Sequence, residues 1–181
     1  RAFTLRTEAV CTAEIAVYTS TEGRRQAISD LLDVAEAMEE PGEMLYVDSE
    51  QSRWLLEDTA YARTWVRRML KLLDRGFTFR AALHFSVSVD RFVSFFQMCS
   101  PLIFHRNAHW YYHQYYDENI YWFSFFILEH AMSVTGMSMA TDQTSTTVFT
   151  DAYSILQHRN VFHMVLTSCR PMFTELTIDM E

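Results

Sequence analysis

Residues 43–48, EMLYVD, and residues 77–85, FTFRAALHF, frame the segment that decides the fold. Along the second stretch, apolar residues alternate with polar or small ones, which is the period of two of a β-strand. Between the stretches, Asp58 can cap a helix whose apolar residues recur at helical spacing over 61–73, and Gly76 can end it. A strand, a helix and a second strand in this order predict a β-α-β unit, whose crossover favours parallel strands.

Helices and strands alternate on both sides of this unit. Apolar residues at spacings of three and four predict a helix over 21–38, opened by Thr21, and another over 88–101. Residues 132–139 are typical of a strand, a polar Thr/Ser-rich segment follows, and Asp151 can open a closing helix. This order predicts an α/β fold in which helices cover a mixed sheet. The 181 residues are expected to form a single domain, 1–181.

Residues 109–126, HWYYHQYYDENIYWFSFF, gather aromatic rings around one turn signal at residues 117–119. Tyr and Trp carry a polar group that needs a partner when buried, so such a cluster suits a cleft or a subunit contact. The pattern predicts an antiparallel hairpin with two faces. One face carries Tyr111, His113 and Tyr115, and the other carries Trp110, Tyr112 and Tyr116. We expect the histidine-bearing face to meet a ligand; the alternatives are a dimer contact and a core layer.

The composition argues against several functional classes. With 49% hydrophobic and 21% charged residues, the chain is globular rather than disordered. A net charge of -8 and a pI near 5.3 disfavour direct binding to nucleic acid or to anionic membranes. The most apolar stretch, residues 121–128, is far shorter than the roughly 20 residues of a membrane-spanning helix. Three cysteines without a CxxC pair favour a reducing compartment, so we expect a cytoplasmic protein.

Three histidines, His105, His109 and His113, are spaced four residues apart. On a helix they would share one face and form a credible transition-metal site. The neighbouring Asn107 and the density of Tyr and Trp favour an extended run, in which residues four apart lie about 13 Å from one another. Imidazoles at that separation cannot share one ion. We therefore expect neither a metal nor another cofactor.

The order and spacing of several short motifs resemble the C-terminal effector domains of bacterial helix-turn-helix transcriptional regulators, mostly of Firmicutes and Actinobacteria. The resemblance covers about residues 17–176. Its landmarks are Thr21-Glu22-Gly23-Arg24-Arg25 with Ala27, Trp54-Leu55 with Asp58, Trp65 before Leu72-Leu73 and Arg75-Gly76, Pro101-Leu102, Tyr111-Tyr112 with Tyr115 and Asp117, Val134-Thr135, and Cys169-Arg170-Pro171-Met172. It implies a phospholipase-D-like fold that has lost its catalytic residues, and ligand sensing by a homodimer. It also implies that DNA is bound only through a domain preceding Arg1.

Two features of the sequence bear on this resemblance. Phospholipase-D chemistry uses the motif H-x-K-x4-D, in which the lysine holds phosphate charge, but His113 is followed by glutamine and tyrosine. Without that cation we expect no enzyme activity of this type. The residues near Cys99, at 105–106 and at His113 are bulkier or more ionisable than the family pattern. This departure implies a pocket retuned for a different ligand.

Ligands in open α/β sheets lie outside the carboxyl ends of the strands, which adds the ends of the two β-α-β strands to the candidate site. The candidate ligand-binding residues are Asp48, Trp54, His84, Ser86, Tyr111, His113 and Tyr115, with Trp54 in a lid-like loop. Asp48 and Ser86 can alternatively serve as turn formers or caps. Together with these residues, the resemblance implies the ligand-sensing and dimerisation domain of a bacterial transcriptional regulator, which binds a small organic molecule in an aromatic cleft. The alternatives are a degenerate phosphodiesterase-like hydrolase, using His84 or His113 with Asp48, and a protein-interaction module.

Overall fold

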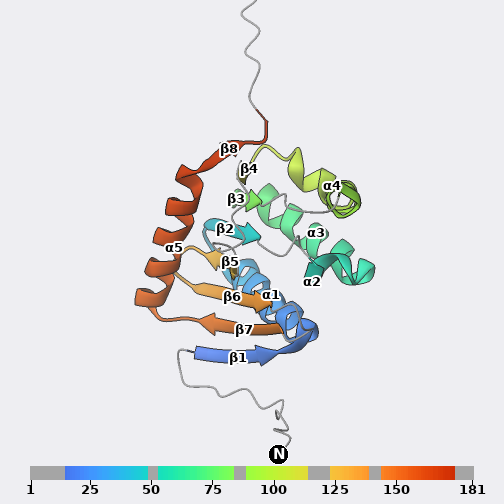
Figure 1. Ribbon diagram of the computed structural model, residues 1–181. Coiled ribbons are helices and arrows are strands. Elements are labelled where there is room, and N and C mark those ends of the chain that lie inside the picture. The colour runs from blue at the N-terminus through green and yellow to red at the C-terminus, as the bar shows by residue number, and fades with distance from the viewer. Residues whose placement is uncertain (1–14, 49–52, 84–88, 114–122, 139–143, 174–181) are drawn as a thin grey trace, which may run out of the picture.

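The computed structural model describes residues 15–48, 53–83, 89–113, 123–138 and 144–173. These residues form one mixed sheet, drawn in Figure 1, in the order β1-β7-β6-β5-β2-β3-β4-β8. The strands are β1 (Ile15–Thr19), β2 (Glu43–Asp48), β3 (Thr78–Leu83), β4 (Ala108–His113), β5 (Phe123–Leu128), β6 (Met132–Ser138), β7 (Thr144–Phe149) and β8 (Cys169–Pro171). The β2–β3 and β3–β4 pairs are parallel, and the other pairs are antiparallel.

Helices cover the two faces of the sheet unequally, as Figure 1 shows. They are α1 (Ser20–Ala37), α2 (Arg53–Leu56), α3 (Thr59–Asp74), α4 (Val89–Ile103) and α5 (Ala152–Thr167). The larger apolar core lies between the sheet and α1 to α4, and a smaller one lies between the opposite face and α5. The predicted α/β fold, a mixed sheet covered by helices, is therefore confirmed.

The β-α-β unit predicted from the sequence is present as β2, α3 and β3. Asp58 caps α3 through its Oδ1 atom, which accepts a hydrogen bond from the Tyr61 backbone N–H at 2.9 Å. The helix is followed by Gly76 at φ +103°, a conformation that glycine adopts without steric cost. A second crossover through α4 adds β4 as a third parallel strand. The carboxyl ends of β2, β3 and β4 therefore lie at one edge of the sheet.

The prediction of one aromatic hairpin over 109–126 is wrong. Strand β4 pairs with β3 and β8, whereas β5 pairs with β2 and β6, so two strands separate them. The turn signal at 117–119 lies outside the described residues. The physical reason is that α4 carries the chain to the free edge of β3, so β4 completes the parallel unit instead of folding back on β5. The antiparallel hairpin that does form joins β5 and β6.

Three strands lie where the sequence predicted none. The Thr/Ser-rich segment forms β7, which pairs with β6 and with β1, an unpredicted strand at the opposite end of the chain. Threonine is β-branched, so the composition of this segment suits a strand, but the polarity of the segment resembles that of a loop. The segment can be polar because α5 leaves this flank of the sheet partly open. Strand β8 closes the other edge by pairing with β4.

Aromatic rings fill the centre of the larger core. Phe79 is fully buried, and its ring lies 5.4 Å edge-on from that of Trp110. Phe126 contacts Tyr46, Phe79 and Trp65, with ring centroids 5.6, 6.0 and 6.5 Å apart. Edge-to-face pairs of this kind contribute about 0.5–1.5 kcal/mol each beyond the area they bury. Phe126 therefore joins three strands and α3 into one packed unit.

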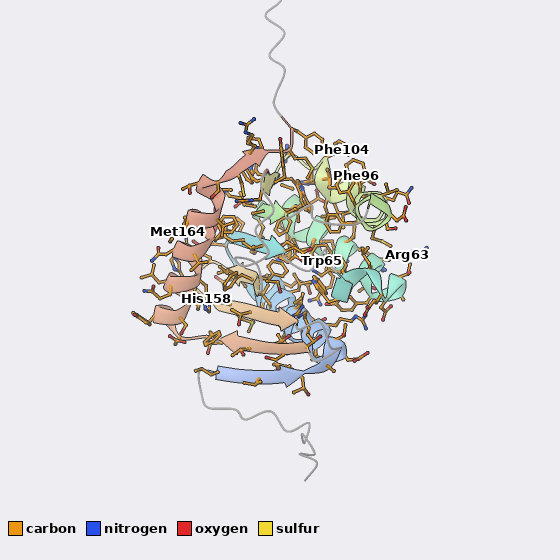
Figure 2. The ribbon with its side chains drawn as sticks, viewed as in Figure 1. Arg63, Trp65, Phe96, Phe104, His158 and Met164 are labelled. Atoms are coloured by element: carbon orange, nitrogen blue, oxygen red, sulfur yellow. The ribbon has the colours of Figure 1, made fainter. Side chains whose placement is uncertain are left out.

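Helix α5 is held to the second face by apolar contacts, which bury Ile155 as well as Phe162, and by polar contacts. Phe162 is fully buried under the helix. His158 Nδ1 lies 2.8 Å from Ser133 Oγ on β6, and Figure 2 shows His158 on the side of α5 toward the sheet. Arg159 Nη2 lies 3.5 Å from Glu43 Oε2 on β2. These contacts fix which side of α5 faces the sheet.

The His158 contact predicts a loss of stability in acid. Burial lowers the pKa of His158 from its ordinary value of 6.5, and the Asp151 carboxylate opposes that shift in part. Because the folded pKa is depressed, the neutral imidazole stabilises the fold above pH 6.5, and this stability is lost as the pH falls through the folded value. We expect His158→Asn, which keeps a polar group near Ser133 but does not titrate, to flatten this part of the profile. Urea unfolding between pH 7.5 and 5.5 measures it, and parallel profiles for both proteins would contradict it.

Candidate functional site

A row of buried polar residues crosses the sheet near the carboxyl end of β2. Strand register sets Thr146 on β7 beside Gly136 on β6, and Gly136 beside Ser124 on β5. Asp48 ends β2, one residue beyond the Val47–Phe125 pair, so it continues the row next to Ser124. Asp48, Ser124 and Thr146 are all buried, on the face covered by α1 and α4.

Arg24 on α1 completes this arrangement from the helix that covers this face of the sheet. Its side chain is 1% exposed, and Nε donates a hydrogen bond to Thr146 Oγ1 at 3.2 Å. The guanidinium lies directly over Gly136, where a Cβ atom would overlap it. A residue with a side chain at that position could not admit the arginine, which explains the glycine inside the strand. We call Arg24, Asp48, Ser124, Gly136 and Thr146 the polar row.

Asp48 brings a negative charge close to α4. The Cys99 thiol is buried there, and burial together with the Asp48 charge raises its pKa far above the ordinary value. Burial also raises the pKa of Cys169 to about 11. Both thiols are therefore protonated at neutral pH, and neither has the lowered pKa of a reactive cysteine. The chemistry of this region belongs to the carboxylate, the guanidinium and the hydroxyls.

Burying the polar row is unfavourable in free energy. Removing a carboxylate and a guanidinium from water costs several kcal/mol each, and well-packed apolar residues would often serve stability as well. Charged groups kept in an interior near the end of a parallel strand are therefore candidates for a functional role. The arrangement offers a cation, an anion and two hydroxyls within a few strands, which suits recognition of a polar organic molecule.

Aromatic side chains lie on the same face of the sheet as the polar row. Trp54 is buried in α2, and its Nε1 donates to the Tyr46 hydroxyl at 3.3 Å, so it is a core residue rather than part of a lid-like loop. Its backbone oxygen accepts from Arg25 Nε at 2.8 Å. Trp65 packs edge-on against Trp54, and among the described residues its buried Nε1 has no hydrogen-bond acceptor. A buried donor without an acceptor costs about 1–3 kcal/mol.

The four predicted site residues that the structure describes do not come together. Asp48 and Trp54 lie on the face of α1 to α4, whereas Tyr111 and His113 alternate with core-facing Trp110 and point to the α5 face. Opposite them on β8 are Pro171 and Cys169, and both Tyr111 and His113 are half-buried. His84, Ser86 and Tyr115 lie outside the described residues.

The placement of Asp48 and His113 argues against a hydrolase that uses these two residues together. A general base and its carboxylate must lie within hydrogen-bond reach, and Asp48 and His113 lie on opposite faces of the sheet. Among the described residues there is also no group of three His, Cys, Asp or Glu side chains that could hold a metal ion. His105 instead lies 3.2 Å from Asp74 Oδ1.

None of the helices in the described part of the chain has the length and apolar character that a membrane-spanning helix needs.

Sequence reasoning missed Arg24, Ser124, Gly136 and Thr146. Two features of the sequence nevertheless pointed to Arg24 and Gly136. Arg24 occupies the apolar stripe of α1, three residues before buried Ala27, and a charged residue in such a stripe needs an explanation. A glycine inside a strand indicates close approach by another group. The identity of that group could not be read, because α1 and β6 are more than 90 residues apart.

No protein-family model matches the sequence, and no curated protein matches it. Solved structures do resemble its fold. NucT from Helicobacter pylori superimposes with a TM-score of 0.61 at 12% identity, over 87% of this chain and 98% of that chain. Nuc from Salmonella typhimurium, a phospholipase D family member, gives a TM-score of 0.59 at 9% identity, over 88% of this chain and 98% of that chain.

A third similar structure is that of TrmBL2, an archaeal chromatin protein described as showing a novel mode of DNA binding. It gives a TM-score of 0.60 at 11% identity and covers 92% of this chain. The chain spans 56% of that protein's length, or about half. At these identities the likeness shows the fold alone. The chain has a phospholipase-D-like α/β fold.

Proposed function

We propose that this chain is the effector-sensing and dimerisation domain of a transcriptional regulator, and that a small organic molecule binds over the polar row. The observation that carries the proposal is the burial of Arg24 and Asp48 at the carboxyl edge of a sheet of this fold. A regulatory role is supported by the likeness to TrmBL2, which covers nearly all of this chain. DNA would be contacted by a part of the protein outside this chain, because the net charge of -8 disfavours direct contact.

The residues of the chain favour binding over chemistry. The sequence holds a single lysine, Lys71, which is exposed on α3, so no histidine is followed two residues later by a lysine. Phosphoryl transfer needs such a cation where negative charge develops, and losing one electrostatic donor costs about a hundredfold or more in rate. Arg24 cannot serve in its place while it lies over Gly136 and bonds Thr146. We therefore propose that no bond is broken at this site.

The polar row also suits the transmission of a signal. Its groups come from α1, β2, β5, β6 and β7, which are separate parts of the chain. A ligand that engages Arg24 and Asp48 together favours one position of α1 relative to the sheet. The population of that position can change only by the ligand's differential affinity for the two arrangements, about 1.4 kcal/mol for each tenfold.

Ligand binding can be assigned to one face of the sheet by two matched variants. We expect Asp48→Asn, which keeps the shape of the side chain, to remove most of the thermal stabilisation that a bound effector gives. We expect the double variant Tyr111→Phe, His113→Gln on the opposite face to retain it. Thermal-shift screening of sugars, aromatic acids and organic cations provides the effector, because a ligand of the folded state raises the midpoint by mass action. The reverse pattern would move the site to the α5 face, and no hit in a broad panel would contradict the sensor function.

A protein-interaction module is the second candidate, and an exposed ring cluster favours it. Phe92, Phe96, Phe104 and Phe173 form a continuous series with centroid separations of 6.0, 6.0 and 5.5 Å. Phe104 is 67% exposed, and Figure 2 shows it close to Phe96 beside α4. A partner protein captured by the wild type but not by Phe104→Ser, with no response to small molecules, would favour this function.

A further inference from the structure

Helix α3 carries a large share of the positive charge of this acidic chain. Together with its C-cap residue Arg75, it holds five of the 15 Lys and Arg residues, beside a single acid, Asp74. Arg68 contacts two carboxylates of α1, and Arg75 donates to two backbone oxygens at the C-terminal end of α1. These two cations therefore hold α3 to α1. The remaining three are Arg63, Arg67 and Lys71, which we call the α3 cationic stripe.

The α3 cationic stripe lies on the outer side of the helix. Its residues are four apart, so each rises about 6 Å and turns about 40° from the one before, and the stripe is about 12 Å long. All three side chains are exposed, whereas the opposite side of α3 is buried in the larger core. Figure 2 shows Arg63 on the side of the helices turned away from the sheet. In the part of the chain that the structure describes, none of the three side chains forms a salt bridge or a hydrogen bond.

The stability of the helix does not explain the α3 cationic stripe. An exposed helix that is stabilised by its charges carries opposite charges three or four residues apart. Arg63 and Arg67 have no Asp or Glu at those positions within α3. Asp74 is three residues after Lys71, but it lies 3.2 Å from His105 Nε2 instead. Like charges four residues apart weaken a helix, so this arrangement indicates a partner outside the described residues.

The surroundings of the α3 cationic stripe indicate the class of partner. None of the exposed large apolar side chains in the described ranges lies on α3. Protein interfaces depend on buried aromatic and apolar anchors, and helices that lie on a membrane insert an apolar face. Interfaces with DNA are more polar and more positively charged, and Arg and Lys make many of the phosphate contacts. A duplex carries one negative charge per about 1.7 Å of its axis, so a stripe about 12 Å long meets several phosphates.

We propose that the α3 cationic stripe contacts the phosphate backbone of double-stranded DNA. The choice of DNA rests on the proposed function, in which a part of the protein outside this chain makes the main contact. The net charge of -8 repels DNA from the rest of the surface, so a second contact is confined to this stripe and turns α3 toward the duplex. Because Arg68 joins α3 to α1, the helix that carries Arg24 lies beside the helix that contacts DNA. Contacts to phosphate position a protein on the duplex and carry no sequence information.

Fluorescence anisotropy of a short labelled DNA duplex, titrated with the full chain at a series of low salt concentrations, tests the contact. We expect weak binding that is equal for two unrelated sequences and decreases with salt. The double variant Arg63→Gln, Arg67→Gln should bind about tenfold more weakly or worse, with a slope of log K against log salt that is shallower by about two. Arg106→Gln, Arg170→Gln is the matched control, because it removes the same charge from two exposed positions outside α3. It should keep the wild-type slope. Arg63→Lys, Arg67→Lys should keep most of the affinity, since a phosphate contact needs the positive charge.

The outcomes separate this inference from the proposed function. A wild-type chain that does not bind the duplex at the lowest salt overturns the contact, and equal losses in the two glutamine variants overturn its location on α3. Polyglutamate that binds more tightly than the duplex at equal charge concentration would assign the stripe to an acidic protein and overturn the choice of DNA. Circular dichroism checks that each variant folds. The thermal shift given by an effector is measured separately: duplex binding through α3 without any effector response contradicts the sensor function alone, and an effector response without duplex binding contradicts this inference alone.

Discussion

Replacing Gly136 by alanine should lower the free energy of unfolding by about 2–4 kcal/mol, although alanine is normally the better residue inside a strand. The added Cβ would overlap the Arg24 guanidinium, which has no free space because it is 1% exposed. Arg24 must therefore leave its position and lose its bond to Thr146 Oγ1. Displacing a buried charged group leaves polar partners unsatisfied, at about 1–3 kcal/mol or more. Urea unfolding measures the loss, and effector stabilisation should disappear with it.

Two further variants isolate the cause of that loss. Gly42→Ala is the matched control, because its Cβ would meet chiefly the flexible carboxylate end of Glu129, and it should change stability by less than about 0.5 kcal/mol. In an Arg24→Met background, Gly136→Ala should become much less costly, since the overlap with a rigid guanidinium is gone. A Gly136→Ala protein as stable as the wild type would show that Arg24 has another low-energy position, and the polar row would no longer be a fixed site.

The fold was predictable where local signals agreed with one another. Asp58, the apolar face of α3 and Gly76 set the ends of one helix, and the strand that follows it had a clear alternation of apolar with polar or small residues. Crossover rules then fixed the parallel pairing without any knowledge of distant residues. The Asp151 cap of α5 was readable for the same reason, and its Oδ1 accepts from Ser154 N–H at 2.8 Å. Each of these features depends on neighbours in the sequence.

Features that depend on distant pairing were not predictable. The ring-rich segment around Trp110 carried good strand and turn signals, but those signals cannot say which strand will be its neighbour. The Thr/Ser-rich strand β7 pairs with β1, more than 120 residues earlier, and a single sequence contains no trace of that partner. The same limit hid the candidate site, because Arg24 and Thr146 are 122 positions apart. The sequence shows that Arg24 is a charged residue within an apolar stripe, but it does not show which residues Arg24 contacts.

The aromatic segment also illustrates why composition alone misplaces a site. Trp110 and Tyr111 are adjacent in sequence but lie on opposite faces of β4. Trp110 is a core residue whose Nε1 donates to the Leu102 backbone oxygen at 3.4 Å, so its polar group is satisfied without any ligand. The polar tips of Tyr and Trp need partners, and here the fold itself provides at least two of them, since Trp54 bonds Tyr46. A high density of rings is therefore compatible with a core as well as with a cleft.

Replacing Phe126 by alanine should produce the largest loss of stability, about 3–5 kcal/mol. Phe126 is 2% exposed, and its ring touches Tyr46, Phe79 and Trp65, which belong to two other strands and to α3. Truncation removes the transfer free energy of the ring and leaves a cavity that three rigid aromatic neighbours cannot close. Urea unfolding followed by tryptophan fluorescence measures the change directly, since Trp65 reports on the same contact.

The control for this variant is Phe104→Ala, which removes the same atoms from a side chain that is 67% exposed. Its cost should stay below about 1 kcal/mol, because little apolar area is lost from the interior. Both variants should be compared at several protein concentrations, so that any effect on self-association is separated from the stability of the single chain. Equal losses for the two phenylalanines would mean that the ring cluster beside α4 is as well packed as the core. A small loss for Phe126→Ala would mean that the larger core can close around the missing ring, contrary to its dense aromatic contacts.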